Sequence, residues 1–181
     1  VGDESLTDSV MWTLRSRVPW LLVNLVTAVL ASLVIKQFDA SLEQMVALAV
    51  LMPIVASMGG NAGTQTMAVT VRALATNRIG AVNAPRLIAR EAWVGVLNGL
   101  ILSVVIAAVV FVWFGSGRLG LVIGVAMIVN LMAAALAGIL IPLALDRHDI
   151  DPAPASGVFV TTVTDVVGFF VFLGLASYWL L

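Results

Sequence analysis

Long apolar stretches dominate this chain, and short polar segments separate them. Stretches without Asp, Glu, Lys or Arg cover residues 18–35, 44–71, 92–117, 119–145, 152–164 and 166–181. Crossing about 30 Å of hydrocarbon takes about 20 apolar helical residues, and only one residue divides the last two stretches. The pattern therefore predicts five transmembrane helices, at about residues 18–38, 45–71, 92–114, 119–145 and 156–180.

The composition excludes most other classes of protein. Apolar residues make up 61% of the chain, charged residues make up 10%, and the mean hydropathy is +1.12. An ordinary soluble domain has about a quarter charged residues. The apolar stretches are continuous rather than alternating, which argues against a transmembrane β-barrel. We therefore predict an all-α membrane protein that lies in a lipid bilayer.

The charges predict the orientation of these helices. With the N-terminus in the cytoplasm, only Lys36 and Arg118 fall outside, in agreement with the positive-inside rule. Five helices then place the C-terminus outside. The net charge of −1 predicts no nucleic-acid partner. The arginines expected on the cytoplasmic side are Arg15, Arg17, Arg72, Arg78, Arg86, Arg90 and Arg147.

The chain divides into two parts of unequal length. Residues 1–17 are polar and do not begin with Met. We expect them to be a cytoplasmic lead-in that follows an N-terminal region of a longer protein. Residues 18–181 are expected to form one five-helix transmembrane domain.

One carboxylate, that of Asp165, falls inside a predicted transmembrane helix. An Asp at the centre of such a helix costs about 2.5–3.5 kcal/mol on insertion scales, and ionisable residues there usually face an aqueous path or a partner. Thr161 and Gly168 lie four residues before it and three after it, which gives the helix a small, polar stripe. We interpret this stripe as the lining of a cavity. The alternative is a protonated Asp165 that is hydrogen-bonded to a neighbouring helix.

Permissive and polar residues interrupt the second predicted helix. Pro53 is followed by the sequence GGNAGTQT at residues 59–66. Glycines let a backbone approach another helix or turn its carbonyls toward an ion, and Asn61 offers a neutral oxygen. We expect a broken helix here, because such helices usually line a cavity or are buried in protein. Close helix packing alone is the alternative.

Two further glycine pairs match a packing motif of membrane helices. Gly95 and Gly99 are four residues apart, as are Gly120 and Gly124. Small residues at this spacing let two helices come close together. We expect these pairs to pack helices and assign them no chemistry.

The remaining candidate ligands are hard oxygen donors near helix ends. Glu91 begins the third predicted helix, and Asp151 precedes Pro152, a residue well suited to start the last one with Asp151 as its cap. The chain has no Cys and a single peripheral His, so zinc and copper are poor matches. Mg²⁺ suits one or two carboxylates because it dehydrates reluctantly and keeps several waters.

These motifs together resemble the membrane domain of the MgtE family of magnesium channels, across essentially all of residues 10–181. The resemblance rests on segments that occur in the same order along the expected helices. They are PIVASMGGNAGTQ at 53–65, RALA at 72–75, Arg90 and Glu91 with Gly95, DPA at 151–153, and TTVTDVVGFF at 161–170.

The resemblance implies a homodimer in a bacterial inner membrane, with a central pore between the subunits lined by the second and fifth helices. It also implies passive uptake of Mg²⁺. In the family, the residue matching Asp165 projects from both subunits and holds a largely hydrated Mg²⁺ with help from backbone oxygen near Thr161. The metal-site candidates are Asp165, Thr161, Asp151, Glu91 and Asn61, and the pore-lining candidates are Gly59, Gly60, Gly63 and Gly168.

The resemblance further implies a regulatory region upstream of this chain. Family members usually carry a cytoplasmic helical domain and a pair of CBS domains that sense Mg²⁺ and close the pore, and we expect these upstream of residue 1 rather than within residues 1–181. One departure is Gly157, where some members have an Asn near the cytoplasmic mouth. An ion site that uses that side chain is not expected here.

Other functions stay open at this stage. A proton-coupled divalent cation transporter could use Asp165 as a protonatable site, since intramembrane carboxylates often have this role. A non-transporting assembly subunit built by glycine packing would leave Asp165 unexplained. We do not expect an enzyme, because the chain has no Gly-rich phosphate loop and no His-Glu zinc motif.

Overall fold

The computed structural model describes residues 4–80 and 83–181, and every regular element in those ranges is a helix. Five of the helices are long and apolar enough to cross a membrane, which confirms the predicted number. A short additional helix, α2, was not predicted. The helices are α1 (Val10–Lys36), α2 (Asp39–Gln44), α3 (Val46–Ala75), α4 (Ala84–Phe114), α5 (Gly117–Arg147) and α6 (Pro152–Trp179).

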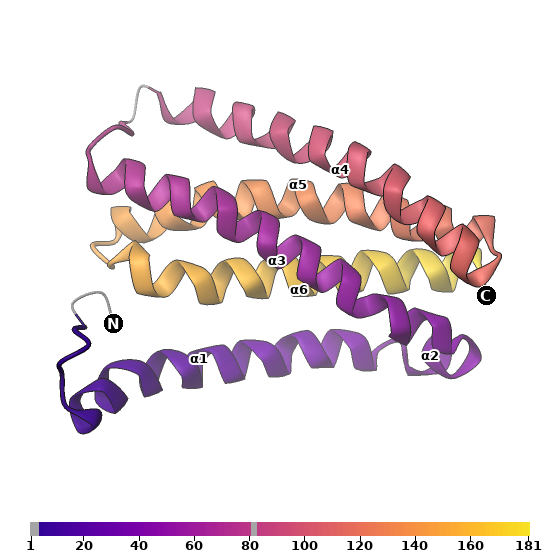
Figure 1. The fold of residues 1–181 in the computed structure, drawn as a ribbon, viewed down its shortest axis with the longest axis horizontal. Coiled ribbons are helices and arrows are strands. Elements are labelled where there is room, and N and C mark those ends of the chain that lie inside the picture. The colour runs from indigo at the N-terminus through magenta and orange to yellow at the C-terminus, as the bar shows by residue number, and fades with distance from the viewer. Residues whose placement is uncertain (1–3, 81–82) are drawn as a thin grey trace.

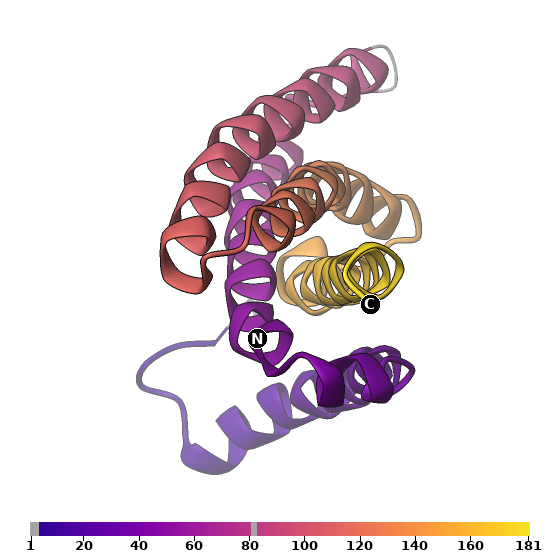
Figure 2. The ribbon, with the colours of Figure 1, turned by 90° about the vertical axis from the view of Figure 1, so that its right-hand side faces the viewer.

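The five long helices run alternately up and down, with α5 at the centre (Figure 1). α5 packs against α3, α4 and α6, and α3 also packs against α6. The view along the bundle in Figure 2 shows α4 on the outer side of α5 and α1 beyond α6. α1 packs against α6, and its single buried residue is Ala31. The rest of α1 therefore exposes apolar side chains to its surroundings.

The two ends of the bundle differ in their number of basic residues. The start of α1, the α3–α4 connection and the α5–α6 connection lie at one end (Figure 1). The elements that meet there carry the seven arginines expected in the cytoplasm, whereas Lys36 and Arg118 lie on elements that meet at the other end. The fold thus places most of the basic residues at one end of the bundle, as the positive-inside prediction needs.

Several helices are longer than the predicted transmembrane segments. α1 begins at Val10 rather than near 18, where the hydroxyl of Ser9 accepts a hydrogen bond from the Trp12 N–H at 3.2 Å. α4 begins at Ala84 rather than near 92. Charged residues mark where the hydrocarbon ends, but a helix can continue into the headgroup region because its backbone bonds are internal. The first turns of α1 are therefore built from the lead-in.

The predicted break in the second transmembrane helix is wrong, because α3 continues without interruption through Pro53 and residues 59–66. Backbone groups in a bilayer have no water to bond with, so a continuous helix is favoured even for residues of low helix propensity. The hydroxyl of Thr64 donates to the Gly60 carbonyl at 2.8 Å, and that of Thr70 donates to the Thr66 carbonyl at 2.9 Å. These polar side chains are thus satisfied within α3 itself.

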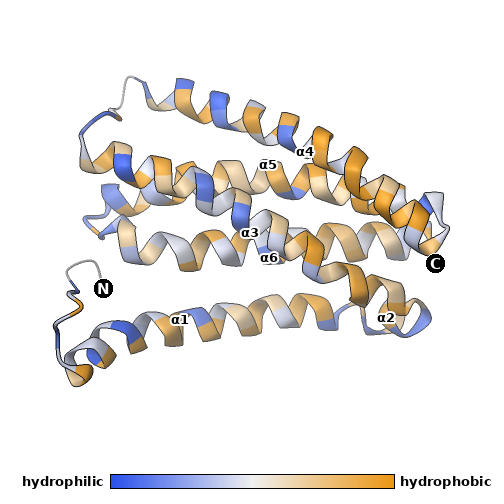
Figure 3. Ribbon diagram, viewed as in Figure 1, coloured by the Kyte–Doolittle hydropathy of each residue, from blue (hydrophilic) through white to orange (hydrophobic). Residues whose placement is uncertain are grey.

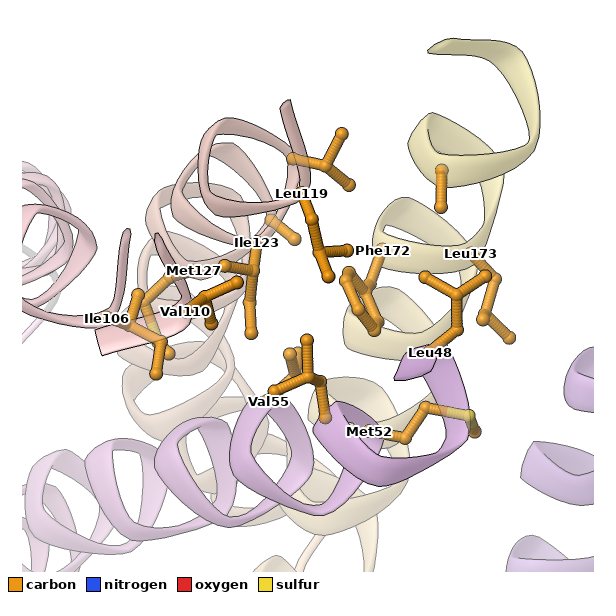
Figure 4. Close-up of a cluster of buried hydrophobic side chains, with 14 of the residues drawn as sticks. Leu48, Met52, Val55, Ile106, Val110, Leu119, Ile123, Met127, Phe172 and Leu173 are labelled. Carbon is orange, nitrogen blue, oxygen red and sulfur yellow. The ribbon is translucent and has the colours of Figure 1, made fainter. Parts of the chain in front are cut away.

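An apolar core fills the end of the bundle opposite the arginines (Figure 4). Leu48 and Val55 from α3, Ile123 from α5, and Phe172 and Leu173 from α6 are fully buried there. Figure 3 shows that the helices are mainly hydrophobic over their length, with hydrophilic residues scattered along α3, the first half of α4 and the first half of α1.

The glycine pairs pack α4 against α5, as predicted. A Cβ at Gly95 would lie 2.9 Å from the Leu131 carbonyl oxygen, and one at Gly99 would lie 2.8 Å from the Ile128 Cα. From the α5 side, a Cβ at Gly120 would lie 2.9 Å from the Ala107 carbonyl oxygen. Backbones this close leave no room for a side chain, so both helices need glycine at these contacts.

Candidate functional site

Asp165 lies in the middle of α6, and its side chain is half buried. Its carboxylate forms no hydrogen bond and no ion pair with residues 4–80 or 83–181. A protonated Asp165 bonded to a neighbouring helix, the alternative given above, therefore has no counterpart within the described part of one chain. The carboxylate has its full capacity to accept hydrogen bonds from a ligand or from water.

The threonines next to Asp165 are satisfied by the backbone of their own helix. The buried hydroxyl of Thr164 donates to the Thr161 carbonyl at 3.0 Å. The hydroxyl of Thr162 donates to the Val158 carbonyl at 2.7 Å. Thr161 itself is exposed, one turn before Asp165. The groups on this part of α6 that are open to a ligand are therefore the Asp165 carboxylate and the Thr161 side chain.

Gly157, Thr161 and Asp165 follow one another at intervals of four residues and form what we call the Asp165 face of α6. A Cβ at Gly157 would meet no atom within 4 Å. The same is true of Gly60 on α3, whose neighbour Thr64 is exposed. Both helices thus have an open, small or polar surface in addition to their packed one.

Three of the four pore-lining candidates pack helices within the chain. A Cβ at Gly59 would overlap the side-chain nitrogen of Asn130 and lie 3.1 Å from the Thr164 Cβ, and one at Gly168 would lie 2.7 Å from the same nitrogen. Gly63 faces the side chain of Val160 on α6. These buried glycines match the packing alternative, whereas Gly60 faces open space.

Glu91 lies near the start of α4 and connects that helix to α3. One carboxylate oxygen accepts a hydrogen bond from the Thr66 hydroxyl at 3.4 Å, and the other lies 3.1 Å from the guanidinium of Arg90. The Glu91 side chain is 15% exposed, whereas that of Arg90 is 68% exposed. The carboxylate is thus largely enclosed and partly neutralised by its neighbour in sequence.

A crevice lined by both polar and apolar residues runs between α3 and α4, with α5 at its floor. A cavity of about 310 Å³ at Glu91 and a second of about 180 Å³ at Asn61 share Ala62, Gln65, Asn98 and Leu131 among their lining residues. We call these two cavities together the α3–α4 crevice. Asn61 therefore faces α4, away from the contact of Gly59 with Thr164 on α6.

The structure does not bring all the predicted ligands into one cluster. Glu91 and Asn61 lie along the α3–α4 crevice, and Asp165 and Thr161 lie on α6. Within residues 4–80 and 83–181, no three His, Cys, Asp or Glu residues are close enough to hold a metal ion together. A cation held by side chains of one copy of the chain would thus keep most of its water.

Asp151 caps α6, as predicted from the Asp-Pro sequence. Its Oδ1 accepts a hydrogen bond from the Ala153 N–H at 3.1 Å, and Pro152 is the first residue of the helix. Asp151 is exposed. It is thus a structural residue of α6 as well as a candidate ligand at the arginine-rich end of the bundle.

Sequence reasoning missed Asn130, a fully buried residue of α5 that lies where α3, α5 and α6 meet. Its Nδ2 donates to the Val55 carbonyl on α3 at 3.1 Å. A signal was present, because Asn130 is the single polar side chain in the predicted helix at 119–145. The cost of a polar group inside a transmembrane helix, which drew attention to Asp165, applies to the neutral amide of Asn130 more weakly.

Comparison with known proteins identifies one family. The sequence profile of MgtE, described as a divalent cation transporter, matches residues 52–175. The chain is also similar to three proteins named magnesium transporter MgtE. Those of Bacillus subtilis and Thermus thermophilus are 36% and 35% identical over 161 residues, which is 89% of this chain and 36% of each relative.

The third relative, from Enterococcus faecalis, is 35% identical over 177 residues, which is 98% of this chain and 39% of that protein. The chain thus spans less than two fifths of the length of these relatives. All three are bacterial proteins named for transport rather than catalysis. Together with the five apolar helices, they indicate a multi-pass protein of the bacterial plasma membrane.

Proposed function

Since the chain belongs to the MgtE family of divalent cation transporters, we propose that it is the ion-conducting part of a magnesium channel that admits Mg²⁺ passively. The observation that carries this proposal is the Asp165 carboxylate. It lies in the middle of a membrane-spanning helix, half buried, with no hydrogen bond to residues 4–80 or 83–181. A charge in that position is costly unless a cation or water faces it.

Two copies of the chain complete the proposed site. If the Asp165 faces of two subunits meet at a two-fold axis, two carboxylates face each other and their charge of −2 matches one Mg²⁺. Mg²⁺ requires near-ideal octahedral coordination and releases its waters reluctantly. The ion is therefore held as a hydrated species, and the carboxylates accept hydrogen bonds from its waters.

Thr161 has a supporting role in this proposal. Its carbonyl oxygen accepts the Thr164 hydroxyl and, as part of an unbroken helix, the N–H of Asp165, so both of its lone pairs are engaged. Its exposed hydroxyl is therefore the group that can bond to a water of the ion. Gly60 on α3 leaves open space and is the glycine best placed to line the path.

Further cations are held toward the arginine-rich end, which we propose to be cytoplasmic. Asp151 is exposed there, and Glu91 and Asn61 line the α3–α4 crevice. Arg90 reduces the charge available at Glu91, so that site is weaker than a free carboxylate would be. Weak binding at several sites lets one ion displace the next, which conduction requires.

Regulation belongs to the longer protein. The relatives are more than twice as long as the segment that matches this chain. We propose that a cytoplasmic region with CBS-type domains precedes this segment and responds to internal Mg²⁺. The chain itself supplies the pore and half of the dimer.

The experiment that tests the channel is Mg²⁺ uptake into liposomes that contain the purified chain and an internal fluorescent indicator. Asp165→Asn keeps the shape of the side chain and removes its charge, and Asp165→Ala removes both. We expect both variants to lose Mg²⁺ uptake and divalent block of monovalent current. The matched control is Asp39→Asn, an exposed carboxylate of α2 that we expect to leave uptake unchanged. Unchanged flux in both Asp165 variants contradicts the proposal.

A second candidate, a proton-coupled transporter, rests on the same unpaired carboxylate. Asp165 would then alternate between its protonated and charged forms, a frequent role of intramembrane carboxylates. Uptake driven by an imposed pH gradient at zero membrane potential would favour it. Uptake that follows the Mg²⁺ gradient and the membrane potential alone favours the channel.

A further inference from the structure

Asn130 on α5 is a polar residue at the centre of an apolar bundle. Its side chain is 0% exposed, and its Nδ2 donates to the Val55 carbonyl oxygen on α3 at 3.1 Å. Val55 lies one turn before Gly59 on the same helix. Asn130 thus joins two helices through a side chain to backbone bond that no water can replace.

Two glycines make the space that the Asn130 amide occupies. A Cβ at Gly59 on α3 would overlap the amide, and a Cβ at Gly168 on α6 would lie 2.7 Å from its nitrogen. Both helices therefore present bare backbone to this one side chain. Rotation of α6 by one residue would bring Val167 or Phe169 against the amide, and rotation of α3 in one direction would bring Met58.

An amide at this position destabilises the folded chain if its role is only to fill space. Its Oδ1 is buried and has no hydrogen-bond partner in the part of the chain that the structure describes. A buried acceptor without a partner destabilises the folded state, and an apolar side chain of the same shape would avoid this. Leu has the same branched arrangement of side-chain heavy atoms as Asn, with bulkier terminal groups, so filling this space does not by itself require an amide at Asn130.

The contacts of Asn130 lie directly next to Asp165. The Cβ of Thr164, the residue before Asp165, lies 3.1 Å from the place that a Cβ at Gly59 would take. Gly168, which contacts the amide, is three residues after Asp165. Thr164 and Gly168 are buried, whereas Asp165 is half exposed. Because the buried side of α6, with Thr164 and Gly168, faces α3 and the amide, Asp165 must lie on another side of the helix.

We propose that Asn130 is a positioning residue for the ion path, an inference that rests on the proposed channel function. Its bond to Val55 and its fit between Gly59 and Gly168 fix the rotation of α3 and α6 about α5. The Asp165 face of α6 and the open surface at Gly60 are thereby held away from the core. Asn130 does not touch the ion; it acts through the placement of Asp165.

The main test is Asn130→Leu in the chain reconstituted in liposomes. We expect the thermal unfolding temperature in detergent to change little, because the variant loses both the bond to Val55 and the unpaired oxygen. The Mg²⁺ concentration for half-maximal uptake should rise about threefold or more, the size of a lost interhelical hydrogen bond in a membrane. Divalent block of monovalent current should weaken in parallel. The control is Asn24→Leu on α1, an exposed Asn that should change neither quantity.

A second pair of variants keeps the proposal testable if Asn130→Leu does not fold. Gly59→Ala alone should unfold or aggregate because its Cβ overlaps the amide, and Asn130→Ala in the same chain should restore folding. The restored double variant should still need more Mg²⁺ for half-maximal uptake. Half-saturation equal to that of the original chain in the double variant, or in folded Asn130→Leu, overturns the positioning role.

The two proposals fail in different ways. If Asp165→Asn abolishes Mg²⁺ uptake while Asn130→Leu leaves half-saturation unchanged, the channel stands and the positioning role is wrong. If Asp165→Asn has no effect, the channel proposal itself is wrong, whatever the Asn130 variants do.

Discussion

The hydroxyl of Thr66 on α3 donates to the carboxylate of Glu91 on α4 across 3.4 Å, and Arg90 lies 3.1 Å from the other oxygen of that carboxylate. Both helices pack on α5, and this bond joins them at one end of the α3–α4 crevice. Glu91 is therefore a link between helices as well as a negative charge at the arginine-rich end.

The two roles of Glu91 can be separated by substitution. Glu91→Gln keeps an oxygen for Thr66 and removes the charge, so we expect normal folding. The Mg²⁺ concentration for half-maximal uptake should increase about two- to fivefold, because Arg90 already screens the lost charge. Thr66→Val removes the link and keeps the charge. It should lower the unfolding temperature slightly and leave half-saturation unchanged. Equal half-saturation in Glu91→Gln and the original chain would remove Glu91 from the ion path.

Glycine-to-alanine changes should differ sharply between Gly99 and Gly60. A Cβ at Gly99 would lie 2.8 Å from the Ile128 Cα, and backbone cannot move aside easily, so Gly99→Ala should destabilise the bundle by about 1–3 kcal/mol. A Cβ at Gly60 meets nothing within 4 Å, so Gly60→Ala should unfold no earlier than the original chain. Thermal unfolding in detergent measures both variants.

The same Gly60 variant also examines the ion path. Because Gly60→Ala should fold normally, a loss of Mg²⁺ flux in this variant reports the width or polarity of the path rather than stability. Full flux would mean that Gly60 faces lipid or a partner surface instead.

Asp151 should show a cap effect and a charge effect that can be measured independently. Asp151→Ala removes the acceptor for the Ala153 N–H and should cost about 1 kcal/mol of stability, seen as a lower unfolding temperature. Asp151→Ser keeps a capping oxygen and should keep most of that stability. If the charge attracts cations, both variants need the same higher Mg²⁺ concentration for half-maximal uptake. A change in uptake that appears only with Asp151→Ala would instead point to the cap.

Acid should weaken the attachment of the lead-in to α1. Arg17 donates hydrogen bonds to both carboxylate oxygens of Glu4, which lowers the pKa of Glu4 below its ordinary value. The stabilising effect of this pair is therefore complete above the pKa of Glu4 in the unfolded chain and is lost as the pH falls through the lower, folded value. An NMR titration of the Glu4 carboxyl carbon should give a midpoint below that of a free Glu, and Arg17→Gln should raise it. A midpoint that Arg17→Gln does not move would show that the pair does not form in solution.

Local patterns were sufficient to predict much of this fold. The five transmembrane helices follow from charge-free stretches, because a bilayer leaves few other structures possible. The spacing of Gly95 and Gly99 and the Asp-Pro pair at Asp151 are each visible within a few positions of the sequence. Such features can be predicted because the pattern that signals them lies in one short segment, even where the contacting residues lie elsewhere.

Other features depend on neighbours that sequence does not reveal. The break expected in α3 rested on Pro53 and the glycines at 59–63, but these residues also suit a continuous helix that packs closely on α5 and α6. Asn130 and Val55 are 75 residues apart, so no local pattern connects them. The separation of Asn61 from Asp165 is likewise set by the rotation of α3 against α4 and α6.

The start of α6 has an electrostatic consequence for any cation that moves along this helix. A helix N-terminus normally carries about half a positive charge, concentrated on its unbonded N–H groups. Of the first three residues of α6, Pro152 and Pro154 have no N–H, and the N–H of Ala153 is bonded to Asp151. The helix dipole is therefore largely masked at the end where it would repel a cation. In the proposed channel, an Mg²⁺ ion between the Asp165 face and the arginine-rich end would meet a negative group at that turn instead of a barrier.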